Sequence, residues 1–169
     1  MALFKRTRID SSLNEGLDAA LGGRGEVLAQ ATGDGVVLVG TREALALRRD
    51  GAWQVWPWED VSGGGWKSES GSFRWKSIEG EKFSVQLSEP NQLPGLFRER
   101  VEASTVVQCL IDSPVRGEVQ IICRRGLGAD QPLRWYAVPS GGADLADPAT
   151  AAAVVAETDR LREEYFPGV

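Results

Sequence analysis

Two cysteines and no histidine limit the catalytic chemistry open to this sequence of 169 residues. Without imidazole, neither a Ser-His-Asp triad nor a Cys-His pair can form, and the most common general base is missing. Cys109 and Cys123 each alternate with apolar residues along a strand-like run, a pattern typical of small core residues rather than reactive thiols. Two cysteines cannot complete a Cys₄ zinc site. The sequence therefore predicts no catalytic residue, no metal site and no cofactor.

Two short segments carry other residues that could do chemistry. The run Ser62-Gly63-Gly64-Gly65 follows a predicted strand but lacks the Lys-Ser/Thr pair and the helix of a phosphate-binding loop, so we expect a bend at a barrel corner. Glu59 and Asp60 could pair as acid and base, but adjacent residues on a strand point to opposite faces. We expect them to form a solvated turn, and we predict that the chain is not an enzyme.

The hairpin around Asp50-Gly51 carries the residues best suited to binding. Asp-Gly between two apolar runs is typical of a two-residue type I′ turn, which places Arg48 opposite Trp53 and Leu45 opposite Trp56. Trp53 and Arg48 then share the face away from the core, and an aromatic ring beside an arginine is typical of interface anchors. The alternative is a surface indole that packs under Arg48 or under the C-terminal part of the chain.

The N-terminus supplies a second candidate binding region. Lys5, Arg6 and Arg8 form a basic, partly hydrophobic start that could contact a partner or an anionic membrane, the alternative being a solvated terminus. The net charge of −5 argues against nucleic-acid binding. No segment approaches the roughly 20 apolar residues needed to span a bilayer, and no apolar region follows the basic start as in a secretory signal. We expect a cytoplasmic protein.

The elements that position these residues follow from periodicity. A short helix capped by Asp10 or Ser11 ends at Gly22-Gly23. An alternating pattern then predicts seven strands over residues 26–31, 35–40, 43–49, 52–58, 62–69, 72–78 and 82–88. A turn at Ser70-Gly71 predicts that Trp66 lies opposite Trp75. A connection with an odd number of residues, 79–81, keeps the aromatic faces of the sixth and seventh strands together.

The rest of the chain predicts two helices and three more strands. A helix is expected over residues 93–103, followed by strands at 105–111, 118–124 and 133–138. Asp147 at the N-cap and Pro148 at the first helical position begin a C-terminal helix.

Seven antiparallel strands followed by a helix resemble the pleckstrin-homology-like (PH-like) fold. The runs VVLVGTREALAL and WQVWPWEDVSGG are similar to the second to fourth strands of bacterial PH-like domains, through Thr41, Ala44, Leu45 and the segment 57–61. The segment LPGLFRERVEASTVVQ resembles an uncharacterised family of bacterial PH-like proteins.

The resemblance covers residues 26–104 and implies an α+β, mainly β fold. This core would be a seven-stranded antiparallel PH-like barrel or sandwich capped by a helix. Residues 1–25 would form an N-terminal segment with a short helix. Residues 105–169 would form an extension of β-strands and a helix that packs on the core, giving one domain overall.

The resemblance also implies a function class. The leading hypothesis is a non-enzymatic interaction or scaffold module whose partner is another protein or a second copy of the chain. The runner-up is a small-ligand-binding or catalytic barrel with a pocket between the sheet and the C-terminal extension. A filled core favours the first hypothesis, and a closed apolar cavity with converging polar groups favours the second.

Overall fold

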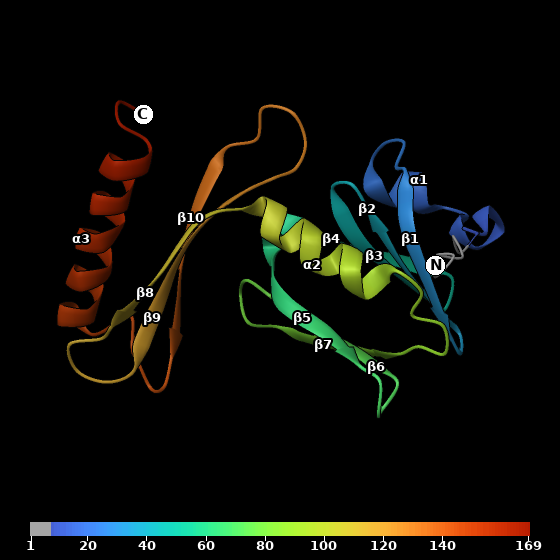
Figure 1. Ribbon diagram of the computed structural model, residues 1–169, viewed down its shortest axis with the longest axis horizontal. Helices are drawn as coiled ribbons and strands as arrows, with labels where there is room; N and C mark the ends of the chain where they lie inside the picture. The colour runs from blue at the N-terminus through green and yellow to red at the C-terminus, as the bar shows by residue number, and fades with distance from the viewer. Residues whose placement is uncertain (1–7) are drawn as a thin grey trace, which may run out of the picture. The chain divides into compact units, whose positions relative to one another are not determined.

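The computed structural model describes residues 8–169 and divides the chain into two compact units (Figure 1). The described part of the first unit consists of residues 8–104 and the loop 126–131, and the second of residues 105–125 and 132–169. Both units are built on antiparallel sheets, so the predicted mainly β class with helices is confirmed. The boundary predicted between residues 104 and 105 coincides with a boundary between the units. Packing of the extension on the core stays a prediction.

The first unit contains two antiparallel sheets and four short or medium helices. One sheet has the order β1-β2-β3-β4, with strands at Val27–Gly33, Val36–Thr41, Ala44–Arg49 and Ala52–Pro57. The other has the order β5-β6-β7, with strands at Val61–Lys67, Ser72–Ser77 and Lys82–Gln86. The helices are η1 (Ser11–Asn14), α1 (Leu17–Leu21), η2 (Trp58–Asp60) and α2 (Leu93–Ser104). All seven predicted strands are present, and every end lies within two residues of its predicted position.

The two sheets face each other across one core and do not close into a barrel. Among the described residues the single β-bridge between them joins Thr32 to Glu89, which lies outside the named strands of the second sheet. Trp56 of β4 packs edge-on against Trp75 of β6, with ring centroids 5.2 Å apart. α2 closes the core by placing Phe97 against Phe73 at 5.1 Å. Aromatic rings thus fill the space between the sheets, as in a sandwich.

The register of the first hairpin is confirmed. Leu45 lies opposite Trp56, and Arg48 lies opposite Trp53. Asp50 and Gly51 both have positive φ, of 53° and 77°, as a type I′ turn requires. The odd parity of the connection between β6 and β7 is also confirmed, because Trp75 pairs with Phe83 and stacks on it. The connecting residues are 78–80 rather than 79–81, since the Ser77 N–H donates to the Glu81 carbonyl.

The register predicted for β5 and β6 is wrong by two residues. The connection is a four-residue turn, residues 68–71, rather than the two residues Ser70-Gly71, so Trp66 pairs with Phe73 and Gly64 pairs with Trp75. A shift by an even number of residues leaves every side chain on its predicted face. Trp75 therefore still enters the core, and Gly64 leaves room for it: a Cβ at position 64 would stand 2.8 Å from that of Trp75.

The predicted N-terminal helix is divided in two. Asp10 caps η1 by accepting a hydrogen bond from the Ser12 backbone N–H at 3.0 Å. Gly16, with φ of 81°, then interrupts the helical path before α1 begins. Gly22 ends α1 in the left-handed conformation, as expected of a helix C-terminus.

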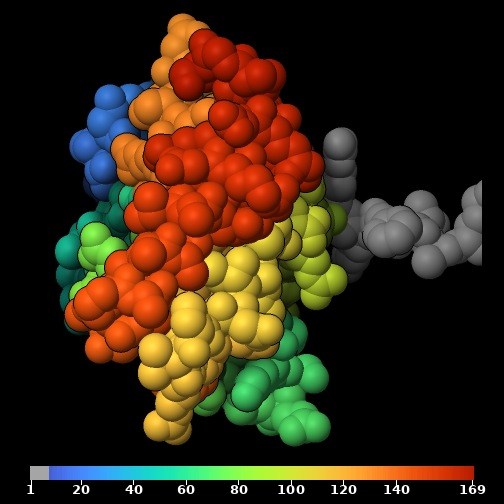
Figure 2. Space-filling view, turned by 90° about the vertical axis from the view of Figure 1, so that its left-hand side faces the viewer, coloured from blue at the N-terminus to red at the C-terminus, as the bar shows by residue number. Residues whose placement is uncertain are grey.

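The second unit is a three-stranded sheet with one helix on it. The strand order is β10-β9-β8, with strands at Leu133–Ser140, Glu118–Arg125 and Thr105–Asp112. α3 (Pro148–Tyr165) begins as predicted, since the Asp147 side chain accepts from the Thr150 backbone N–H. Leu161 of α3 is buried with Val107, Ile121 and Cys123 of the sheet. The outward side of α3, coloured red, is visible in Figure 2.

Candidate functional site

Trp53 and Arg48 share one face of the first sheet, as predicted, and the N-terminal segment covers that face. The indole Nε1–H of Trp53 donates to the Glu15 carbonyl at 2.8 Å, and Arg48 Nη1 donates to the Leu13 carbonyl at 3.2 Å. Trp53 is partly buried and packs against a cluster that includes Leu17 of α1. The indole therefore holds the segment 11–21 on the sheet, a role that the sequence did not indicate. Its role in binding a partner stays a prediction.

The basic N-terminal residues are only partly described. Lys5 and Arg6 lie outside the described residues. Arg8 is exposed at the start of the described chain. None of the helices in the described range 8–169 has the length and apolar character needed to cross a membrane.

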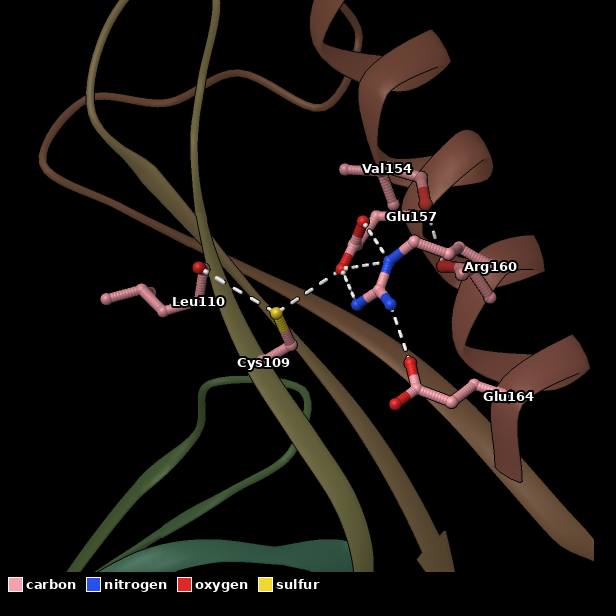
Figure 3. Close-up of polar contacts among 7 residues, drawn as sticks. Cys109, Leu110, Val154, Glu157, Arg160 and Glu164 are labelled. Atoms are coloured by element: carbon pink, nitrogen blue, oxygen red, sulfur yellow. Dashed lines mark hydrogen bonds and ion pairs between the residues drawn. The ribbon is translucent and has the colours of Figure 1, made fainter.

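Cys109 of β8 is partly exposed, and its thiol contacts a carboxylate of α3 (Figure 3). Its Sγ–H donates to Glu157 Oε1 at 3.5 Å, and Arg160 donates to the same carboxylate from Nε and Nη2 at 3.0 and 2.7 Å. Burial raises the pKa of the Cys109 thiol, and the hydrogen bond to Glu157 raises that pKa further. The thiol is therefore held in its protonated, weakly nucleophilic form.

Cys123 is fully buried, and Cys109 packs against the same cluster, as predicted for core residues. Arg160 also donates to Glu164 at 2.6 Å, so one guanidinium links two carboxylates along α3. No group of three or more His, Cys, Asp or Glu side chains in the described part of the chain is placed to hold a metal ion.

A groove runs between strand β5 and helix α2 in the first unit. Its volume is about 410 Å³, and it is lined by Gly63–Trp66 of β5 and by Pro94, Phe97, Arg98, Val101 and Glu102 of α2. A Cβ at Gly63 or Gly65 would meet no atom within 4 Å. The glycines therefore leave one wall of the groove as bare backbone.

The hydrogen bonds of β6 show which backbone groups of β5 are turned outward. The Ser77 N–H donates to the Glu81 carbonyl, and the Leu87 N–H donates to the Gly71 carbonyl. These two pairs lie at the two ends of the β6-β7 ladder, so the odd-numbered residues of β6 bond to β7. Hydrogen-bonded pairs alternate along an antiparallel ladder, so the even-numbered residues of β6 bond to Gly63, Gly65 and Lys67. The N–H and C=O groups of Gly64 and Trp66 are then directed away from β6. They form the free edge of the sheet, beside the groove.

A second, more polar pocket lies at the end of the first sheet where β1 begins and β4 ends. Its volume is about 460 Å³, and the residues 21–26, 42–44, 55–59 and 126–131 contribute to its lining. Arg24, Glu26, Arg42 and Glu43 stand exposed at its rim. Glu59, which the sequence placed in a solvated turn, does lie in the short helix η2 but is only 8% exposed. That prediction is wrong for Glu59, because the loop 126–131 belongs to this unit and Gly126 lies next to the Glu59 carboxylate.

The sequence alone did not indicate either the groove or this pocket. The glycines of β5 are evident in the sequence, but which backbone groups of β5 point away from β6 depends on the register of the two strands. The pocket depends on a contact between residues 59 and 126, which no local pattern encodes.

Comparisons with protein-family models, with curated proteins and with solved structures gave no match.

Proposed function

We propose that this chain is a cytoplasmic, non-enzymatic protein-binding module with a PH-like core at residues 26–104. The element order supports the fold proposal: four antiparallel strands, three further antiparallel strands and then a helix packed on both sheets. The core between the sheets is filled by aromatic rings, which favours a module that binds at its surface over one that encloses a ligand.

The observation that carries the binding proposal is the free edge of β5 beside the groove. An extended peptide can add to such an edge as a further strand, because its backbone groups complete the ladder. Gly64 and Trp66 offer two N–H and two C=O groups, and each hydrogen bond contributes about 0.5–1.5 kcal/mol net. Phe97 and Val101 supply apolar contact for alternate side chains of the peptide. Arg98 and Glu102 at the same wall then select among peptides by charge.

The proposal predicts a specific pattern of amide protection. Peptides selected from a random displayed library on the full chain should bind with their backbone along β5. In the free chain, the amides of Gly64 and Trp66 should exchange faster with solvent than those of Gly63 and Gly65, which donate to β6. Bound peptide should slow exchange at Gly64 and Trp66 and leave the other pair unchanged, as measured by NMR.

A charge reversal separates groove binding from general attraction. Arg98→Glu changes the groove wall, and Arg49→Glu makes the same change of charge at an exposed position outside the groove. We expect the first to alter peptide affinity about tenfold and the second less than twofold, because exposed charges remote from a site contribute little. Equal effects, or protection confined to other strands, would contradict the proposal. Protection of the same two amides that rises with protein concentration alone would identify a second copy of the chain as the partner.

A further inference from the structure

Glu59 is a buried carboxylate that lacks a partner within the described chain. It is 8% exposed, and no residue from 8 to 169 forms a hydrogen bond or ion pair with its side chain. Its neighbour in η2, Trp58, is completely buried. Removing a carboxylate from water without a compensating donor is costly, so nearly all such groups have a partner. The Glu59 oxygens are not among the fully enclosed side-chain atoms without a partner, so a donor can reach them from the pocket that Glu59 lines.

The glycine at position 126 keeps the carboxylate accessible from that pocket. A Cβ on Gly126 would stand only 3.0 Å from Glu59 Oε1 and 3.1 Å from Gln131 Oε1. The two oxygens are thus no more than about 6 Å apart, a span that one ligand carrying several N–H donors can bridge. Gln131 Nε2 already donates to the Ala129 carbonyl at 3.3 Å, which leaves Gln131 Oε1 as an acceptor.

The two acceptors select the chemistry of the ligand. The rim carries both signs of charge, in Arg24, Arg42, Glu26 and Glu43, but these side chains are exposed and water can satisfy them. Glu59 supplies the buried acceptor of the site, and the Gln131 amide oxygen is an exposed acceptor beside it. A planar guanidinium supplies five N–H donors in a fixed fork and keeps its charge when it is partly desolvated, whereas an ammonium presents a single, more strongly hydrated point.

We infer that the pocket between η2 and the loop 126–131 is a binding site for a guanidinium group, with Glu59 and Gln131 as its acceptors. The group is the side chain of a peptide arginine or belongs to a small free guanidine. The volume of about 460 Å³ accommodates either one. This site shares no residue with the groove at the β5 edge, so the two proposals can be refuted independently.

The test is an NMR titration of the full chain with defined probes. The probes are acetyl-Gly-Arg-Gly-amide, the same peptide with citrulline, and agmatine. Citrulline has the shape of arginine without its charge. We expect the arginine peptide or agmatine to shift the resonances of Gly126, Gly128 and Gln131, and citrulline to bind at least about tenfold more weakly. If the arginine peptide binds more tightly than agmatine, the natural ligand is a protein side chain. If agmatine binds more tightly, the natural ligand is a small molecule.

Two matched pairs of variants locate the site. Glu59→Gln should weaken binding about tenfold, whereas Glu43→Gln at the rim should change it less than twofold. Gly126→Ala should block the site, since its new Cβ would press on Glu59 Oε1, whereas Gly128→Ala has only ordinary contacts beginning at 3.5 Å and should bind normally. Glu59→Gln should also keep or raise the melting temperature, because it removes an unpaired buried charge.

Three results would overturn the inference. The first is that no probe shifts these resonances, and the second is that citrulline binds as well as arginine. The third is that calcium chloride alone produces the same shifts and the same loss in Glu59→Gln, which would make the site a cation site of another kind.

Discussion

Replacing Trp53 with alanine removes the side chain that holds the N-terminal segment on the first sheet. Trp53 packs against the cluster containing Leu17, and its indole N–H donates to the Glu15 carbonyl at 2.8 Å. Both contacts join β4 to residues 15–17, which are far from it in sequence. We therefore expect Trp53→Ala to weaken the docking of α1 before it affects the main core.

The size of the effect follows from two contributions. Deleting a fully buried Trp costs about 3–5 kcal/mol, and a partly buried one costs roughly half of that. Loss of the hydrogen bond adds about 1 kcal/mol, with no further penalty if water reaches the freed Glu15 carbonyl. Trp53→Ala should thus lower the free energy of unfolding by about 2–3 kcal/mol. Trp53→Phe keeps most of the ring packing and should cost about 1 kcal/mol.

Urea denaturation followed by circular dichroism measures these losses, and native-state hydrogen exchange locates them. Exchange should accelerate at Ala20 and Gly22, whose amides bond within α1, and remain slow in β6. Trp58→Ala is the control for the main core and should cost about 3–5 kcal/mol without preferential release of α1. If Trp53→Ala costs under about 1 kcal/mol and α1 exchange is unchanged, the anchoring role is refuted. The indole would then be free to serve as the interface anchor that the hairpin sequence predicts.

Two further predictions use matched pairs of residues. Gly64→Ala should lower the free energy of unfolding by about 2 kcal/mol or more, because its Cβ would stand 2.2 Å from the Arg74 carbonyl oxygen, whereas Gly65→Ala should change it by less than about 1 kcal/mol; thermal denaturation distinguishes them. Alkylation of Cys109 should have its pH midpoint above that of an ordinary thiol, because only the thiolate reacts and burial and Glu157 both raise the pKa. Glu157→Gln should lower that midpoint and speed alkylation at pH 8, and Glu164→Gln, which contacts only Arg160, should not.

The local sequence was sufficient to predict strand register where a single turn determines it. Asp50-Gly51 is one of the few dipeptides that favour a two-residue turn with two positive φ angles, so the register from Leu45 to Trp56 followed directly. Ser70-Gly71 supplies only one residue suited to positive φ, and the chain uses a four-residue turn there instead. Alternation still placed Trp75 correctly, because face depends on parity and not on exact pairing.

Long-range contacts explain what could not be predicted. The short N-terminal helix was predicted, but its docking on the outer face of the first sheet was not, because no local pattern pairs residues 13–17 with Arg48 and Trp53. Glu59 was expected to be solvated, because a short turn beside a strand normally is. Its burial depends on a loop 67 residues away in sequence, whose own Gly126-Leu127-Gly128 pattern indicates only a turn.

The three glycines of β5 separate packing from function. Gly64 is explained by the core, because no other residue fits between its backbone and that of Arg74 and Trp75. Gly63 and Gly65 have no such explanation, since a side chain at either would enter open space. Glycine weakens a strand interior, so keeping it at two positions that packing does not require has a cost in stability. The proposed peptide strand would pair with Gly64 and Trp66 in the plane of the sheet, and Gly63 and Gly65 leave the adjoining wall of the groove without side chains.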